Sequence, residues 1–148
     1  VDPLDGTTNY VHGFHVFCIS IGLQWQGELV AGLIDVPMLG KTYKAARGMG
    51  ATVNGEPIKV SSNPLIKDAL LATGFFPDNT TALRDQLKIF SELVYEARGI
   101  RRAGAAAYDL CLVAEGVFDA FWEPNLKPWD AAAGTVLVRE AGGVGVAV

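Results

Sequence analysis

The first residues of the chain, VDPLDGTTN, combine acidic and hydroxyl side chains in a spacing that suits a divalent cation. Asp2 and Asp5 lie three positions apart, and Pro3 stiffens the backbone between them. Their carboxylates and the carbonyl oxygen of Leu4 are hard oxygen ligands of the kind that Mg²⁺ prefers. A turn with solvated aspartate side chains is the alternative interpretation of the same residues.

The residues that follow the second aspartate suit an anion. Gly6 lets the backbone turn closely, so the N–H groups and hydroxyls of Thr7 and Thr8 can face a common point. Two clustered carboxylates would repel an anionic substrate, whereas a bound cation keeps both of them ionised and attracts a phosphate. The stretch therefore predicts metal-assisted transfer of a phosphoryl group to water.

A third carboxylate, Asp130, stands far along the chain in the stretch LKPWDAAAG, residues 126–134. Pro128 is typical of a first helical position, so Asp130 would lie in the first turn of a helix. The positive end of the helix dipole keeps a carboxylate ionised, which suits a ligand that meets Asp2 and Asp5. The alternative is an ordinary helix-start acid that stabilises the helix by less than about 1 kcal/mol.

A second helix start suits a substrate. Gly104, Ala105 and Ala106 are small residues that open a predicted helix, so their free N–H groups can meet an anion or a sugar oxygen. Close packing of this helix against a sheet is a compatible alternative. His12 and His15 are isolated imidazoles, more typical of structural or surface groups than of Mg²⁺ ligands.

The stretches DPLDGTTNYVHGF and LKPWDAAAG resemble the two signatures of the inositol monophosphatase family, in the expected order along the chain. The resemblance runs along essentially the whole sequence, and bacterial inositol-1-monophosphatases are the most similar members. This family belongs to the Mg²⁺-dependent, lithium-sensitive phosphatase superfamily. The resemblance therefore implies a phosphatase with Mg²⁺ as its cofactor.

The resemblance also implies a role for each candidate ligand. Asp2 would bridge two Mg²⁺ ions. Asp5 and Asp130 would hold the second ion, and the carbonyl of Leu4 would hold the first. Thr7 would orient the attacking water, and it joins Asp2 and Asp5 as the expected catalytic residues. A hydroxyl that bonds to its own turn is the alternative role of Thr7.

Substrate contacts are implied in the same way. Glu123 would accept hydrogen bonds from vicinal hydroxyls of the substrate, and its alternative is a solvated charge at the end of a strand. The expected substrate-binding residues are Leu4, Asp5, Gly6, Thr7, Gly104, Ala105, Ala106, Glu123 and Asp130.

Apolar periodicity and turn residues predict the elements that position these side chains. Hairpins are expected around Gln26-Gly27 and around Asn54-Gly55. The expected strands cover residues 15–25, 28–36, 41–46, 58–60, 70–73, 100–103 and 117–122. The first expected helix is capped by Thr80 or Thr81 and ends at Gly99, and its apolar face comprises Leu83, Leu87, Phe90 and Val94. The other expected helices cover residues 105–115 and run from Pro128 to Gly142-Gly143.

This order divides the chain near residues 61–64. Residues 1–63 would form a mostly antiparallel sheet region with the motif DPLDGTTN, and residues 64–148 an α/β region with the motif WDAAAG. The pattern itself supports a mixed α/β (α+β) class. The resemblance implies the layered αβαβα sandwich of sugar phosphatases, here without its N-terminal helical layer and first strands.

Composition limits the classes of partner. The 148 residues carry 12 basic and 16 acidic side chains, and this net charge of −4 argues against a general nucleic-acid surface. No apolar run is long enough to span a bilayer. Cys18 and Cys111 lie in apolar surroundings, which predicts buried reduced thiols in a cytoplasmic protein. The resemblance implies a homodimer of the full-length protein.

The sequence thus predicts a phosphomonoesterase that hydrolyses inositol monophosphate or a similar polyol or sugar phosphate by two-metal activation of water. Fructose bisphosphate, histidinol phosphate and phosphorylated nucleotides are alternative substrates, and a non-catalytic binding or regulatory role is the alternative function. Because the sequence starts one residue before Asp2 and ends in an apolar run, we expect an internal fragment. In the family, a Glu ligand and the acid that works with Thr7 come from the preceding region, so these 148 residues alone should be weakly active or inactive.

Overall fold

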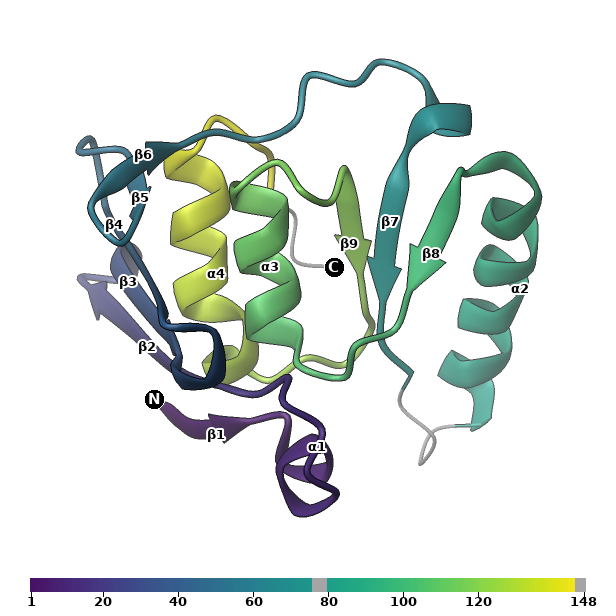
Figure 1. Cartoon of the computed structure of the whole chain (residues 1–148), viewed down its shortest axis with the longest axis horizontal. Helices are drawn as coiled ribbons and strands as arrows, with labels where there is room; N and C mark the ends of the chain where they lie inside the picture. Colours follow the sequence, from purple (N-terminus) through teal and green to yellow (C-terminus); the bar gives the residue numbers. More distant parts are fainter. Residues whose placement is uncertain (76–79, 146–148) are drawn as a thin grey trace.

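Six strands form one antiparallel sheet in the order β1-β2-β3-β4-β5-β6 (Figure 1). The computed structural model describes residues 1–75 and 80–145. The strands of this sheet are β1 (Asp2–Asp5), β2 (Cys18–Trp25), β3 (Glu28–Val36), β4 (Lys41–Ala46), β5 (Ala51–Val53) and β6 (Glu56–Ile58). The bounds of β3 and β4 are those predicted from the sequence, because alternation and turn residues define them locally.

Two tight turns set the register of the hairpins in this sheet. Gln26 and Gly27 have φ angles of 50° and 83°, and Asn54 and Gly55 have φ angles of 50° and 89°. Two successive positive φ angles are typical of the type I′ turn, whose twist matches that of the strands beside it. Both predicted hairpins are confirmed, although the strand after Asn54-Gly55 begins at Glu56 and not at residue 58.

The second sheet is parallel, with the strand order β8-β7-β9. Its strands are β7 (Leu70–Thr73), β8 (Gly99–Arg101) and β9 (Ala120–Trp122). The helices are α1 (Thr7–Val11), α2 (Thr80–Glu96), α3 (Ala106–Ala114) and α4 (Pro128–Glu140), and the 3₁₀ turns are η1 (Pro37–Leu39) and η2 (Ile66–Asp68). Helices α2 and α3 each connect two parallel strands, as parallel pairing requires.

The elements are arranged in layers. Helices α3 and α4 lie between the two sheets, and α2 lies on the far side of the three-stranded sheet (Figure 1). Ile34 and Tyr43 of the large sheet, Cys111 of α3 and Leu137 of α4 are completely buried in one shared core. The fold therefore belongs to the mixed α/β class that the sequence pattern predicts, in the layered arrangement that the resemblance implies.

Small residues let α4 approach the large sheet closely. A Cβ at Gly32 would lie 2.5 Å from the Ala133 carbonyl oxygen, and a Cβ at Gly22 would lie 2.7 Å from the Ala132 Cβ. No side chain fits at either glycine, so the backbone of α4 lies almost directly on β2 and β3. This packing fixes the first turn of α4, which carries Asp130, relative to the sheet that carries β1.

The buried face of α2 differs from the prediction. Periodicity placed Leu83, Leu87, Phe90 and Val94 on the inner face, yet Leu87 and Val94 are 47% and 48% exposed. Gln86 is instead the buried side chain, with only 2% of its surface exposed. Hydrophobic periodicity counts apolar residues alone, so a buried polar contact can shift the inner face without leaving that signal. Helix α2 begins at Thr80, so Thr80 and Thr81 lie within the helix and do not precede it as the predicted cap.

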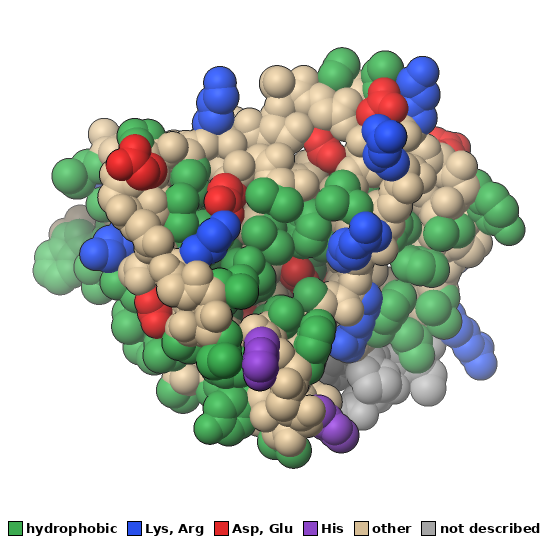
Figure 2. All heavy atoms as spheres, viewed as in Figure 1, with side chains coloured by type: hydrophobic (Ala, Val, Ile, Leu, Met, Phe, Trp, Pro, Cys, Tyr) green, Lys and Arg blue, Asp and Glu red, His purple; other side chains and the backbone are tan. Residues whose placement is uncertain are grey.

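The two cysteines and the two histidines lie in different environments. Cys18 and Cys111 are buried and free, as predicted. His12 and His15 are exposed, and the two imidazoles lie at the surface in Figure 2. Among the described residues, no helix combines the length and the apolar character needed to cross a bilayer.

Candidate active site

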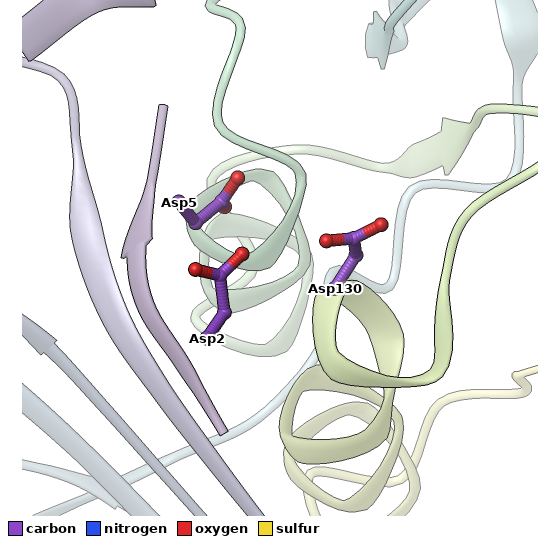
Figure 3. Close-up of side chains that lie close together, drawn as sticks. All are labelled: Asp2, Asp5 and Asp130. Carbon is purple, nitrogen blue, oxygen red and sulfur yellow. The ribbon is translucent and has the colours of Figure 1, made fainter. Parts of the chain in front are cut away.

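Three aspartates meet where β1 passes the first turn of α4. One oxygen from each of Asp2, Asp5 and Asp130 lies within 4.8 Å of the other two. Figure 3 shows the three carboxylates directed into a common space, two from β1 and one from α4. Asp2 and Asp130 are 128 positions apart in the sequence, and the packing of α4 on the sheet brings them close in space.

A register shift in β1 allows Asp2 and Asp5 to share one side of the strand. In a regular strand, residues three positions apart point to opposite faces. Here Asp2 pairs with Ser20 and Asp5 with Cys18, so three steps along β1 match two steps along β2. The extra residue behaves as a β-bulge, a feature that redirects side chains. The bulge explains how the D-P-x-D spacing produces a shared site.

The turn after Asp2 directs the Leu4 carbonyl and the Thr7 hydroxyl toward one another. The Leu4 N–H donates to Asp2 Oδ1 at 3.0 Å, and Thr7 Oγ1 donates to the Leu4 carbonyl at 3.0 Å. Gly6 has a φ of 85°, and a Cβ there would lie 2.8 Å from the Val16 carbonyl oxygen. The Leu4 carbonyl keeps a second lone pair, and the Thr7 oxygen keeps its own lone pairs to accept a proton.

Asp5 lies against the amino-terminal end of α3. The Ala107 N–H donates to Asp5 Oδ2 at 2.8 Å, and the Cys18 thiol lies 3.6 Å from the same oxygen. Burial raises the pKa of Asp5 to about 6, the Ala107 N–H opposes this rise, and the charge of Asp2 adds to it. The predicted anion-binding helix start therefore meets a carboxylate of the protein itself, one residue beyond Ala106.

Asp130 accepts a hydrogen bond from the backbone at the start of its own helix. The Lys127 N–H donates to Asp130 Oδ2 at 2.7 Å, a contact that fixes the start of α4. Burial raises the pKa of Asp130, the Lys127 N–H lowers it, and the charge of Asp2 raises it further. Asp130 therefore faces Asp2 across the shared space.

A cavity of about 140 Å³ opens beside the aspartates. It is lined by Asp5, Gly74, Arg102, Gly104, Ala106, Glu123, Leu126 and Asp130. Burial raises the pKa of Glu123 to about 7, which Arg102 opposes. Of the helix-start residues, Gly104 and Ala106 line the cavity, whereas Ala105 is 1% exposed and lies in the core.

Sequence reasoning did not assign three of these lining residues. Gly74 follows β7, Arg102 follows β8 and Leu126 follows β9, so all three come after the carboxyl ends of parallel strands. Ligand-binding sites in parallel sheets form at the carboxyl ends of the strands, so the position of these residues after predicted strands was the signal that could have identified them. Gly74 and Arg102 stand in no distinctive motif, whereas Leu126 opens the stretch LKPWDAAAG.

Asp109 on α3 is a further buried acid near this cavity. It is 1% exposed, and among the described residues its Oδ1 has no hydrogen-bond partner. Burial, followed by the charge of Glu123, raises its pKa to about 8. Burial therefore favours the protonated form of Asp109 in the folded protein.

We expect Asp109→Asn to flatten the dependence of stability on pH. Because the folded-state pKa is raised, the contribution of Asp109 is fully present below about pH 4 and is lost as the pH rises through about 8. Asparagine does not titrate, and a folded-state pKa of about 8 makes the loss of wild-type stability between pH 5 and pH 9 about 4 kcal/mol. The variant should therefore gain at least about 8 °C in melting temperature relative to wild type over this range, since 1 kcal/mol shifts the melting temperature by about 2 °C or more. Melting profiles of both proteins measure this, with Asp85→Asn on the exposed face of α2 as the control. Parallel profiles for wild type and Asp109→Asn would contradict the assignment.

Comparison with known proteins gives concordant matches along the chain. The model of the inositol monophosphatase family matches residues 1–148. Fructose-1,6-bisphosphatase/inositol-1-monophosphatase of Aquifex aeolicus is 46% identical over 144 residues, 97% of this chain and 54% of that protein. Nus factor SuhB of Pseudomonas aeruginosa is 47% identical over 146 residues, with shares of 97% and 54%.

A solved structure agrees with these matches. The crystal structure of the extragenic suppressor protein suhB from Bartonella henselae superposes with a TM-score of 0.92 at 45% identity, over 96% of this chain and 54% of that one. The chain therefore spans about half the length of the proteins it matches.

Proposed function

Because the chain belongs to the inositol monophosphatase family, we propose that the whole protein is a Mg²⁺-dependent phosphomonoesterase. It hydrolyses inositol monophosphate, or a similar polyol or sugar phosphate, to the free alcohol and inorganic phosphate. The observation that carries this proposal is the convergence of Asp2, Asp5 and Asp130 to within 4.8 Å.

The donor set fits a hard divalent cation. Three carboxylates and the Leu4 carbonyl are oxygen ligands, and the shared space is bordered by negative charge that burial makes costly. Asp2 would contact two Mg²⁺ ions, the Leu4 carbonyl the first, and Asp5 with Asp130 the second. Bound Mg²⁺ supplies Lewis-acid chemistry that acidifies water and neutralises the phosphoryl oxygens.

The side chains of the chain orient the reactants. The Thr7 hydroxyl donates to the Leu4 carbonyl, so its oxygen faces the attacking water as an acceptor. Asp5 is held by the Ala107 N–H, which fixes the carboxylate beside the cavity. Gly104 and Ala106 leave room for the substrate, and Glu123 accepts hydrogen bonds from its hydroxyls.

Mg²⁺ titration of the whole protein tests the proposal. We expect a rise in melting temperature with Mg²⁺ and release of phosphate from inositol 1-phosphate. A panel with fructose 1,6-bisphosphate, histidinol phosphate and phosphorylated nucleotides ranks the substrates by kcat/KM. Unchanged melting together with no turnover of any of these phosphates would contradict the proposal.

Glu123→Gln is expected to impair recognition of the alcohol more than the chemistry of the phosphate. Loss of hydrogen bonds to a charged group should raise KM for inositol 1-phosphate about 10- to 100-fold. The kcat/KM for p-nitrophenyl phosphate, which lacks vicinal hydroxyls, should stay within about threefold of wild type, as expected when only binding of the alcohol is lost. Equal losses on both substrates would instead indicate that Glu123 acts at the phosphate.

A second candidate function is a regulatory one, as a Nus factor. It is favoured by the 47% identity to the Pseudomonas aeruginosa protein with that name. In this case the fold would serve as a binding module, and turnover would be dispensable. Loss of the cellular regulatory phenotype on deletion, with full rescue by an inactive Asp2→Asn protein, would support that role.

The family resemblance implies the homodimer, whereas the buried thiols favour a cytoplasmic location and the net charge of −4 argues against binding of nucleic acid. We propose a cytoplasmic homodimer of the whole protein that binds neither membranes nor nucleic acid on its own. Sedimentation of the whole protein, with and without added RNA, measures its oligomeric state and its binding of nucleic acid.

A further inference from the structure

Gln86 is a polar side chain on the buried face of α2. It is 2% exposed, whereas its neighbour Leu87 is 47% exposed. The amide nitrogen Nε2 donates to the Gly74 carbonyl, and it also donates to Thr73 Oγ1 at 3.2 Å. A carbonyl oxygen can only accept, so the orientation of the amide is fixed by this contact. The side chain of Gln86 therefore hydrogen-bonds to Thr73, the last residue of β7, and to Gly74, the residue that follows it.

The same two residues contact the end of β9. Thr73 pairs with Trp122 in the parallel register, and Thr73 Oγ1 donates to the Trp122 carbonyl at 2.8 Å. A Cβ at Gly74 would overlap the carboxylate of Glu123, the next residue after β9. That carboxylate consequently rests directly on the Gly74 backbone, and both residues line the cavity.

The charge of Arg102 lies near the carboxylate of Glu123 but forms no ion pair with it. Within residues 1–75 and 80–145, neither a hydrogen bond nor an ion pair to its oxygens is present. The carboxylate contacts the backbone of Gly74, and the Gly74 carbonyl accepts a hydrogen bond from the amide of Gln86. A site group held by such a chain of contacts is displaced when its supporting residue is removed.

We propose that Gln86 is a positioning residue for Glu123, through Gly74, and so determines selectivity for hydroxylated phosphate esters. This inference rests on the proposed function and extends it to a helix outside the cavity. Gln86 touches no reacting atom, so its removal should affect recognition of the alcohol and leave the chemistry at the phosphate intact.

The test uses the whole protein with Gln86→Met, which keeps the volume and removes the donor. The kcat/KM for inositol 1-phosphate should fall about 10- to 100-fold, because a shift of about 1 Å in a positioning group has effects of that size. The kcat/KM for p-nitrophenyl phosphate should change by less than about twofold, since the phosphate contacts are unaltered. Leu93 is partly buried and lies about two helical turns after Gln86 in α2, so Leu93→Ala serves as a control for loss of helix packing.

Equal losses on both substrates, or the same selectivity change in Leu93→Ala, would overturn the proposal. A crystal structure of Gln86→Met adds a readout that does not depend on activity. The Glu123 carboxylate should move away from Gly74, and an unmoved carboxylate would refute the positioning role even if wild type hydrolyses neither ester. Failure of wild type on both esters in Mg²⁺ would instead overturn the proposed function.

Discussion

Replacement of Asp2 by asparagine should lower kcat/KM for inositol 1-phosphate by at least about 10³-fold. The reason is that this site accelerates hydrolysis mainly by stabilising the charge that develops on the phosphate. Asparagine keeps the size of the side chain and an oxygen that can accept from the Leu4 N–H, 3.0 Å away. It removes the negative charge that faces both Asp5 and Asp130. Initial rates over a range of Mg²⁺ concentrations measure the effect.

The matched control is Asp35→Asn in the same sheet. Asp35 accepts a hydrogen bond from Thr42 Oγ1 at 2.6 Å and lies outside the site. Its replacement should leave kcat/KM within about threefold, as is usual for changes away from the reacting groups. Activity of Asp2→Asn within tenfold of wild type would remove the metal-binding argument for this carboxylate.

Thr7→Ala is expected to reduce kcat by about 10²- to 10⁴-fold with little change in KM, the effect of losing a positioned proton acceptor. The hydroxyl donates to the Leu4 carbonyl, and only its oxygen then remains to orient water. Thr7→Ser keeps this hydroxyl and should recover most of the rate. Steady-state kinetics with saturating Mg²⁺ separate kcat from KM.

Thr8→Ala provides the comparison for this prediction. Thr8 is the next residue of α1, it is exposed, and its hydroxyl has no side-chain hydrogen bond within the described part of the chain. Its loss should leave kcat nearly unchanged. A large effect of Thr8→Ala together with a small effect of Thr7→Ala would reassign the role to the second hydroxyl.

Much of the fold could be predicted because local signals define it. The turns at Gln26-Gly27 and Asn54-Gly55 need positive φ angles, and their residue types reveal that need. Helix α1 was missed because five residues are too short for a periodic pattern. Non-local contacts fix it in place, since Asn9 Nδ2 donates to the Val16 and Ala103 carbonyls.

The candidate site was less accessible to sequence reasoning where it depends on tertiary packing. Asp2, Asp5 and Asp130 stand in long signatures, so they were identifiable in advance. Arg102 and Gly74 reach the cavity from the ends of separate strands, and no short motif marks either of them.

Buried polar residues were the hardest to anticipate. An isolated Asp or Gln in an amphipathic helix normally faces water, yet Asp109 and Gln86 are 1% and 2% exposed. Their burial depends on neighbours from other elements, which periodicity along one helix does not report.

Anomalous scattering from crystals of the whole protein grown with Mn²⁺ in place of Mg²⁺ tests directly whether the three aspartates bind a metal. We expect a strong anomalous peak between the carboxylates of Asp2, Asp5 and Asp130, within metal–oxygen bonding distance of all three, and its loss in Asp2→Asn. No peak at that position, or a peak elsewhere that survives Asp2→Asn, would contradict metal binding by these aspartates.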